Sequence, residues 1–325
     1  MYKFAVLDPR GTPSGQKANE EVFIDPVFGI EVTVPELAAR CVGGNLDPQH
    51  TGGDTSRAAI EDALTEPLPV KGTTLATIRP DLDSVGAMAI LLMRRWDERS
   101  RDYDAPYPGE GAMLNALSSM LKRVRLIATT DKFARGGYTG PKPLPTKDNP
   151  WDESSATAAE SSRQLAALAA AVTDFNVPLV DRVSTMERWL RTGNEPAQYR
   201  TQVEMERLDM ITALETGQIK YETRAGARIA VVESTHRAAT SVGYFLAPVV
   251  VAFNPSFKQG LGEPYKKFTI CQFADGFADI KSALSELATL EAGWGGSPTI
   301  GGSPQGVSSR LTIDKVVEVV AKHLK

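Results

Sequence analysis

The sequence predicts an α/β protein, in which a helical linker joins an N-terminal domain with a mainly parallel sheet to a smaller α+β C-terminal domain. Three observations predict this architecture. The length of 325 residues indicates about two domains at roughly 150 residues each. Residues 73–129 alternate strand and helix patterns, as a parallel α/β unit does. Residues 183–216 are charged and strongly helical, and strand patterns resume after them.

The first 72 residues are expected to form an N-terminal extension that packs on the first domain. Short strand-like pieces occur at residues 3–7 and 31–34. A helix is expected over residues 35–41, because this stretch opens with a proline, and another over residues 55–64.

The first domain itself is expected over residues 73–182. Its pattern predicts a strand at residues 73–78, a tight acidic loop at 81–86 and a buried helix at 87–96. An amphipathic helix at 113–123, a second buried strand at 124–129 and an alanine-rich helix at 154–172 are predicted to follow. Strand, helix, helix, strand is a parallel α/β order.

A helical linker is expected over residues 183–224, and the second domain over residues 225–325. The second domain is predicted to contain three strands, at residues 228–233, 248–253 and 267–273. Two helices are expected at residues 280–290 and 312–324, with a glycine-rich loop between them at residues 293–306.

The composition is that of a folded protein, with 42% hydrophobic and 23% charged residues. A net charge of −4 disfavours non-specific binding to long nucleic acid but allows a local basic pocket for one or two phosphates. Cys41 and Cys271 lie far apart, which excludes a cysteine–zinc site or a disulfide framework. We expect a cytoplasmic protein with no membrane partner, because neither a signal peptide nor an apolar run of about 20 residues is present.

The sharpest local feature is the stretch Thr77-Ile-Arg-Pro-Asp81-Leu-Asp83-Ser-Val-Gly86. Its two carboxylates follow a predicted parallel strand, at the sheet edge where α/β proteins bind ligands. Repulsion between Asp81 and Asp83 would raise the pKa of one of them unless a cation lay between them, which favours Mg²⁺ or Mn²⁺. In the alternative interpretation, both aspartates only cap the following helix.

These residues resemble the first motif of the DHH phosphoesterase superfamily, roughly H-x-x-P-D-x-D-x-x-G, whose histidine and aspartates bind metal. Pro80, Asp81, Asp83 and Gly86 match the motif, and Thr77 stands at the place of the histidine.

Further ligands would come from two other segments. Asp131 follows the second predicted strand and precedes an Arg-Gly pair, which is similar to the family's second motif. Alternatively, Asp131 corresponds to the third motif, because residues 154–160 are similar to the stretch that follows the Asp-His-His triplet in the family. The triplet itself is absent from this sequence. His50 lies in a glycine-punctuated loop and would replace the missing histidine if that loop folds back on the first motif; otherwise the loop is a plain turn.

The glycine-rich segment 293–306 permits close backbone approach and an anion-binding nest of N–H groups, or else is a plain flexible loop. In its context it resembles the substrate loop of the DHH-associated C-terminal domain, with Ser297 at the place of a histidine. The resemblance implies that substrate is bound by Arg79, Gly295, Gly296, Ser297, Gly301, Gly302 and Ser303.

The resemblance therefore implies a metal-dependent phosphoesterase that hydrolyses a small nucleotide or a short single-stranded oligonucleotide. Asp81, Asp83 and Asp131 would be catalytic and, with His50, would bind Mn²⁺ or Mg²⁺, which lowers the pKa of a bound water. The alternative is a catalytically degenerate DHH-like protein that binds a nucleotide or serves as a scaffold. Both functions are compatible with a homo-oligomer.

Overall fold

The structure is a computed structural model that describes residues 2–7, 19–47, 57–100, 117–129, 138, 140–151, 156–258, 263–273 and 276–325. The chain divides into two compact units. Unit 1 comprises Met1–Lys132 and Ser161–Val203, and unit 2 comprises Phe133–Glu160 and Glu204–Lys325. Each unit has its own sheet, one of them entirely parallel and the other mixed, so the predicted α/β fold class is confirmed.

Unit 1 is built on a four-stranded parallel sheet in the order β1-β4-β2-β3. The strands are β1 (Lys3–Val6), β2 (Val27–Ile30), β3 (Asn45–Leu46) and β4 (Thr74–Thr77). Every residue of β2 and β4 is buried, as expected for central strands covered on both faces. Three of the four strands precede residue 73.

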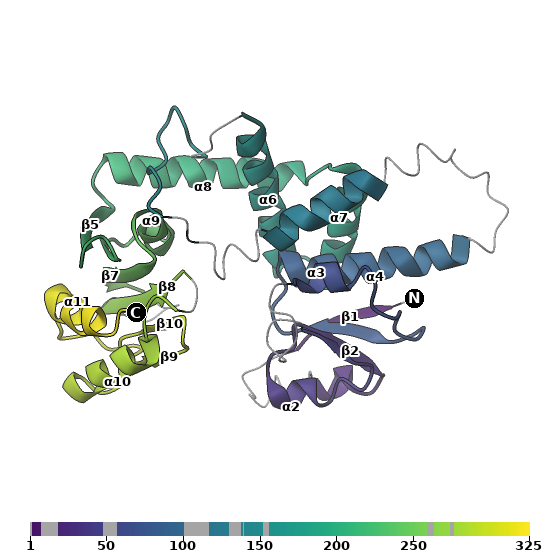
Figure 1. The fold of residues 1–325 in the computed structure, drawn as a ribbon, viewed down its shortest axis with the longest axis horizontal. Helices are drawn as coiled ribbons and strands as arrows, with labels where there is room; N and C mark the ends of the chain where they lie inside the picture. The colour runs from purple at the N-terminus through teal and green to yellow at the C-terminus, as the bar shows by residue number, and fades with distance from the viewer. Residues whose placement is uncertain are drawn as a thin grey trace. The chain divides into compact units, whose positions relative to one another are not determined.

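Helices cover both faces of this sheet (Figure 1). One face carries α3 (Ala59–Asp62), α4 (Leu82–Ser100), α6 (Ala156–Thr173) and α7 (Leu179–Thr192), whose buried side chains form one core with β2 and β4. The other face carries α2 (Pro35–Ala38), which packs through Leu37.

Two strands predicted in this region are wrong. The strand expected at residues 31–34 lies earlier, at β2, because Glu31 has a φ of +54°, which ends the extended backbone. The strand expected at residues 124–129 belongs to a helical stretch, residues 117–129. Its buried residues, Val124, Ile127 and Ala128, are spaced i, i+3 and i+4, which is the spacing of a helix face.

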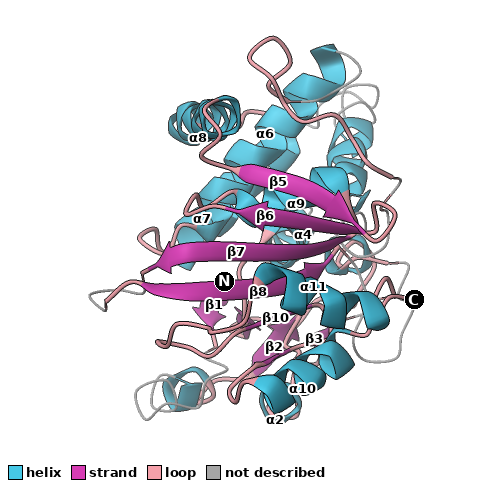
Figure 2. Cartoon of the chain, turned by 90° about the vertical axis from the view of Figure 1, so that its left-hand side faces the viewer, coloured by secondary structure: helices cyan, strands magenta, loops and turns pink. Residues whose placement is uncertain are grey.

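Unit 2 is built on a six-stranded mixed sheet in the order β5-β6-β7-β8-β10-β9 (Figure 2). The strands are β5 (Lys220–Arg224), β6 (Ile229–Glu233), β7 (Val249–Phe257), β8 (Tyr265–Gln272), β9 (Gly295–Gly296) and β10 (Ile300–Gly302). β6 and β7 are parallel and are connected by α9 (Ala239–Leu246); their other neighbours are antiparallel.

The two faces of the second sheet have separate cores. α10 (Ile280–Leu290) and α11 (Ile313–Lys322) cover one face. α9 covers the other, with residues of α8 (Ala197–Glu215). The helix predicted at residues 280–290 is confirmed. The segment predicted as a loop at residues 293–306 contains a short hairpin of β9 and β10, and the rest of it is turn and loop. Within the described ranges, no helix combines the length and apolar character that crossing a bilayer would require.

Candidate functional site

Asp81 caps the N-terminus of α4 at the carboxyl end of β4. Its Oδ1 accepts hydrogen bonds from the backbone N–H of Ser84 at 2.9 Å and from the Ser84 hydroxyl at 2.8 Å. The Ser84 hydroxyl oxygen in turn accepts the N–H of Asp81 at 3.0 Å. This reciprocal pair satisfies N–H groups that the first helical turn leaves without partners. Within the described part of the chain, Oδ2 of Asp81 accepts no hydrogen bond.

Asp83 caps a different helix. It is 1% exposed, and its two oxygens accept the backbone N–H groups of Ala59 and Ile60, each at 2.8 Å. These N–H groups open α3, whose own N-cap residue, Ala58, has no side chain that could accept them. A carboxylate that accepts N–H groups at a helix start is favoured by both hydrogen bonding and the helix dipole.

Gly86 completes the contact between α3 and α4. A Cβ atom at this position would lie 2.5 Å from Cδ1 of Ile60, closer than real Cβ contacts. The motif residues Asp83 and Gly86 therefore both serve the docking of α3: one binds its backbone and the other leaves room for its side chain.

Carboxylates that sequence reasoning missed lie at the same sheet edge. Glu31 directly follows β2 and Asp47 directly follows β3, and they are 9% and 2% exposed. With Asp81, carboxylates thus follow three neighbouring parallel strands. Glu31 was missed because the strand predicted at residues 31–34 includes it. Asp47 was missed because β3 is only two residues long and gives little sequence signal.

The predicted metal ligands are only partly described. Asp131 and His50 lie outside the described residues. Among the residues that the structure describes, no three or more His, Cys, Asp or Glu side chains are grouped so that they could hold a metal ion. Asp83 is buried, and each of its oxygens already accepts one N–H group of α3. The metal-binding role of Asp81, Asp83, Asp131 and His50 stays a prediction.

The predicted substrate residues fall in both units. Arg79 is exposed and belongs to unit 1, and the other six are brought together in the β9–β10 hairpin and the residue after it. The glycines allow close packing: a Cβ on Gly296 would lie 2.3 Å from Cα of Gly301, and one on Gly302 would lie 2.4 Å from the carbonyl oxygen of Phe268.

The two serines of this segment are engaged within it. The Ser297 hydroxyl oxygen accepts the N–H of Ile300 at 3.2 Å and so closes the hairpin turn. Ser303 is buried, and its hydroxyl oxygen accepts the N–H of Phe268 at 3.0 Å. These contacts show a packing role for the segment; its contact with substrate stays a prediction.

A pocket of about 390 Å³, here called the α9 pocket, lies at the carboxyl ends of β6 and β7. The loop between β6 and α9, residues 234–238, supplies one wall, and β7 and β8 supply another, including Lys267 and Thr269. Thr269 pairs with Gly302 in the sheet, so the glycine hairpin adjoins the pocket strand directly. Carboxyl ends of parallel strands are where α/β sheets bind ligands.

The charged residues among the described lining of the α9 pocket are cations. Arg237, Lys258 and Lys267 line it, and none of the described lining residues is an aspartate or glutamate. α9 begins against the pocket, where Ala239 and Thr240 line it, and its N-cap residue, Ala238, provides no side-chain hydrogen bond. The cations favour an anion. At the helix start, the N–H groups of Ala238 and Ala239 already donate to His236.

His236 holds the pocket loop in place. Its Nδ1 accepts the N–H of Ala238 at 3.1 Å, which puts the proton of the neutral ring on Nε2. Nε2 lies 2.9 Å from Oδ2 of Asp209 in α8. Both ring nitrogens are thus engaged, and the ring fixes the turn that leads into α9. A sequence signal for this pocket is the cationic, hydroxyl-rich stretch Ser234-Thr-His-Arg237 between a strand and a helix.

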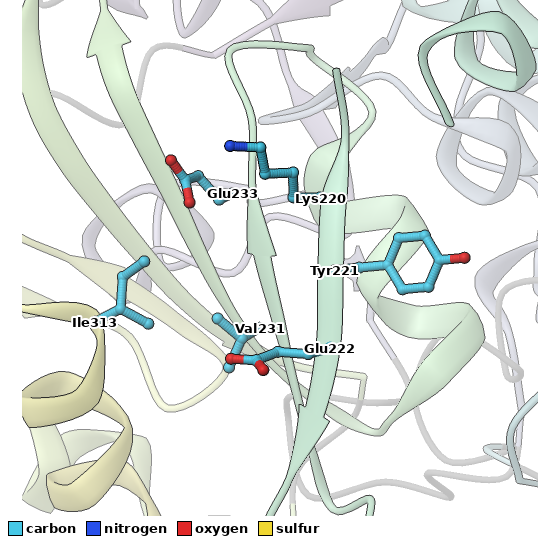
Figure 3. Close-up of a pocket in the computed structure, with 6 residues that line it drawn as sticks. All are labelled: Lys220, Tyr221, Glu222, Val231, Glu233 and Ile313. Atoms are coloured by element: carbon cyan, nitrogen blue, oxygen red, sulfur yellow. The ribbon is translucent and has the colours of Figure 1, made fainter. Parts of the chain in front are cut away.

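A second, smaller pocket of about 220 Å³ lies beside β5 (Figure 3). Lys220, Glu222 and Glu233 line it together with Val231 and Ile313, and Tyr221 points to the other side of the strand. Its lining combines one cation with two carboxylates, whereas the described charged residues that line the α9 pocket are all cations.

No model of a known protein family matches the sequence, and no curated protein matches it. The fold and the pocket define a two-unit α/β protein with a cation-lined pocket in its second unit.

Proposed function

We propose that this protein binds a small phosphorylated ligand, such as a nucleotide, in the α9 pocket. The observation that carries the proposal is the set of three cations, Arg237, Lys258 and Lys267, with no carboxylate among the described lining residues. Phosphate oxygens accept hydrogen bonds from such cations. This proposal corresponds to the alternative given above, in which a catalytically degenerate DHH-like protein binds a nucleotide.

The binding test uses two neighbouring lysines of β8. Lys267 lines the pocket, whereas Lys266 immediately precedes it in the strand, so the Lys266 side chain points to the opposite face. Isothermal titration with the ribonucleoside monophosphates and with ribose 5-phosphate should show at least tenfold weaker binding for Lys267→Ala and unchanged binding for Lys266→Ala. Equal losses in both variants, or no binding to the wild-type protein at millimolar concentrations, would refute the proposal.

A second candidate function is metal-dependent hydrolysis of a small nucleotide or short single-stranded oligonucleotide, with Mn²⁺ or Mg²⁺. It is supported by Asp81, which follows β4 at the carboxyl end of a parallel strand, where α/β proteins bind ligands. Glu31 and Asp47 follow the two neighbouring strands but are not grouped with Asp81 closely enough to hold one ion with it. The test is hydrolysis of a dinucleotide with Mn²⁺, with Mg²⁺ and with EDTA. If Asp131→Asn abolishes metal-dependent turnover but retains nucleotide binding, the protein is an enzyme; nucleotide binding without turnover in either metal identifies the degenerate form.

A further inference from the structure

The α9 pocket is larger than a phosphate group requires. Its volume of about 390 Å³ falls within the range of roughly 300–1,000 Å³ that is usual for pockets that enclose a whole small molecule. A phosphate held by the cations would therefore leave most of the pocket for the remainder of the ligand. The lining of that remaining space indicates what the remainder is.

An aromatic ring is part of that lining. Phe257 ends β7 and lines the pocket. Its ring is braced by Tyr265, which meets it at an interplanar angle of 77° with 5.5 Å between ring centroids. One face of the ring carries the ammonium group of Lys267, with Nζ 4.2 Å from the ring centroid. A cation in this position is attracted by the electron-rich face of the ring.

Lys267 thus links the two parts of the pocket. Its Nζ covers the face of Phe257 and lies 3.4 Å from Oε1 of Gln305, a weak contact for a charged donor. A phosphate is a stronger partner for an ammonium group than an amide oxygen or a ring face is. Binding of a phosphate near Lys267 would draw Nζ away and uncover the ring, which a planar aromatic group can then stack on.

We infer that the ligand of the α9 pocket is a nucleotide whose base stacks on the face of Phe257 while its phosphate binds Lys267, Arg237 and Lys258. This inference rests on the proposed phosphate-binding function and adds the class of the ligand. It requires no chemical step, only the exchange of one partner of Lys267 for another.

The experiment compares nucleoside monophosphates with ribose 5-phosphate, which keeps the sugar and phosphate but lacks the base. Calorimetry on the full-length wild-type chain should show at least one monophosphate binding tenfold or more tightly than ribose 5-phosphate. Phe257→Leu should reduce that ratio to about one, while Phe257→Tyr, which keeps a ring face, should retain it. The thermal unfolding midpoint checks that each variant is folded.

The outcomes separate the two proposals. If ribose 5-phosphate binds as tightly as every monophosphate, or if the ratio is the same in Phe257→Leu as in the wild type, base stacking on Phe257 is overturned. The phosphate-binding function survives that result as long as Lys267→Ala weakens ribose 5-phosphate and Lys266→Ala does not. If neither lysine variant changes phosphate binding, the proposed function itself fails.

Discussion

The carboxylate of Asp83 accepts a hydrogen bond from the backbone N–H of Ile60, with 2.8 Å between Oδ1 and the nitrogen. The second oxygen accepts the N–H of Ala59 in the same way. The aspartate that the sequence marks most strongly as a metal ligand is thereby the cap of α3, a helix that begins 24 residues earlier. A buried carboxylate in this position has a structural consequence that mutation can measure.

Replacing Asp83 should destabilise unit 1. Asp83→Ala leaves two buried N–H groups without an acceptor, and we expect it to lower the free energy of unfolding by about 2–4 kcal/mol. Asp81→Ala removes only the half-buried cap of α4, which is worth about 1 kcal/mol. Urea denaturation gives both values, and amide hydrogen exchange should locate the loss in Asp83→Ala to α3.

The reverse order of effects would change the interpretation of the motif. If Asp83→Ala unfolds like the wild type but loses Mn²⁺ or Mg²⁺ binding, Asp83 is a metal ligand and the α3 contact is incidental. The DHH resemblance would then gain a functional ligand that the present geometry does not provide.

Gly86 and Ile60 should be energetically coupled. Gly86→Ala places a Cβ 2.5 Å from Cδ1 of Ile60, and we expect overpacking to cost about 1–3 kcal/mol, against a gain of about 1 kcal/mol in helix propensity. Ile60→Val removes Cδ1, so Gly86→Ala should be neutral or stabilising in that background. A double-mutant cycle in urea measures the coupling, and additive effects would show that the two side chains do not compete for space.

Elements with strong periodicity were predictable from the sequence. Residues 280–290 form a helix at the predicted bounds because their apolar side chains recur on one face and Asp279 caps them through the N–H of Ser282. Residues 124–129 were wrongly predicted as a strand, because a short apolar run fits a strand and a buried helix equally well. The strand predicted at residues 31–34 was placed too late in the chain, because nothing in the sequence signals the positive φ of Glu31 that ends β2.

The candidate site was less predictable than the fold. Local sequence correctly placed Asp81 just after a parallel strand, but it could not show that Asp83 binds α3, since that contact joins segments 23 and 24 residues apart. The α9 pocket escaped prediction because its cations come from three separated places, Arg237, Lys258 and Lys267, that only the sheet brings together.

Glu206 should limit anion binding at the α9 pocket. Its carboxylate in α8 lies 2.9 Å from Nη2 of Arg237 and so competes with a phosphate for that cation. An exposed ion pair of this kind is worth at most about 1 kcal/mol, so we expect Glu206→Gln to tighten phosphate binding about two- to fivefold. Glu215→Gln is the matched control, because Glu215 ends the same helix and pairs with Lys147. Weaker binding in Glu206→Gln would instead make Glu206 a support for the pocket.

The two thiols should make the protein less stable at alkaline pH. Burial raises the pKa of Cys271 to about 11 from its ordinary value near 9.0, and burial raises the pKa of Cys41 to about 11 despite the opposing charge of Arg40. Below pH 9 both thiols are protonated in the folded and the unfolded chain, so they contribute no pH dependence. Between about pH 9 and 11 only the unfolded chain ionises, and each thiol then favours unfolding by an amount on the order of 2–3 kcal/mol at the upper end.

The free energy of unfolding should therefore fall as the pH rises from 9 to 11. Lysines and tyrosines also titrate in this range, so the measurement is the difference between the wild type and Cys271→Ala or Cys41→Ala, each compared with itself at pH 8. Each variant should show a shallower alkaline loss than the wild type. A parallel loss in all three proteins would show that the buried thiols ionise as readily in the folded chain as in the unfolded one, and rapid alkylation of the native protein by iodoacetamide at pH 8 would agree with that result.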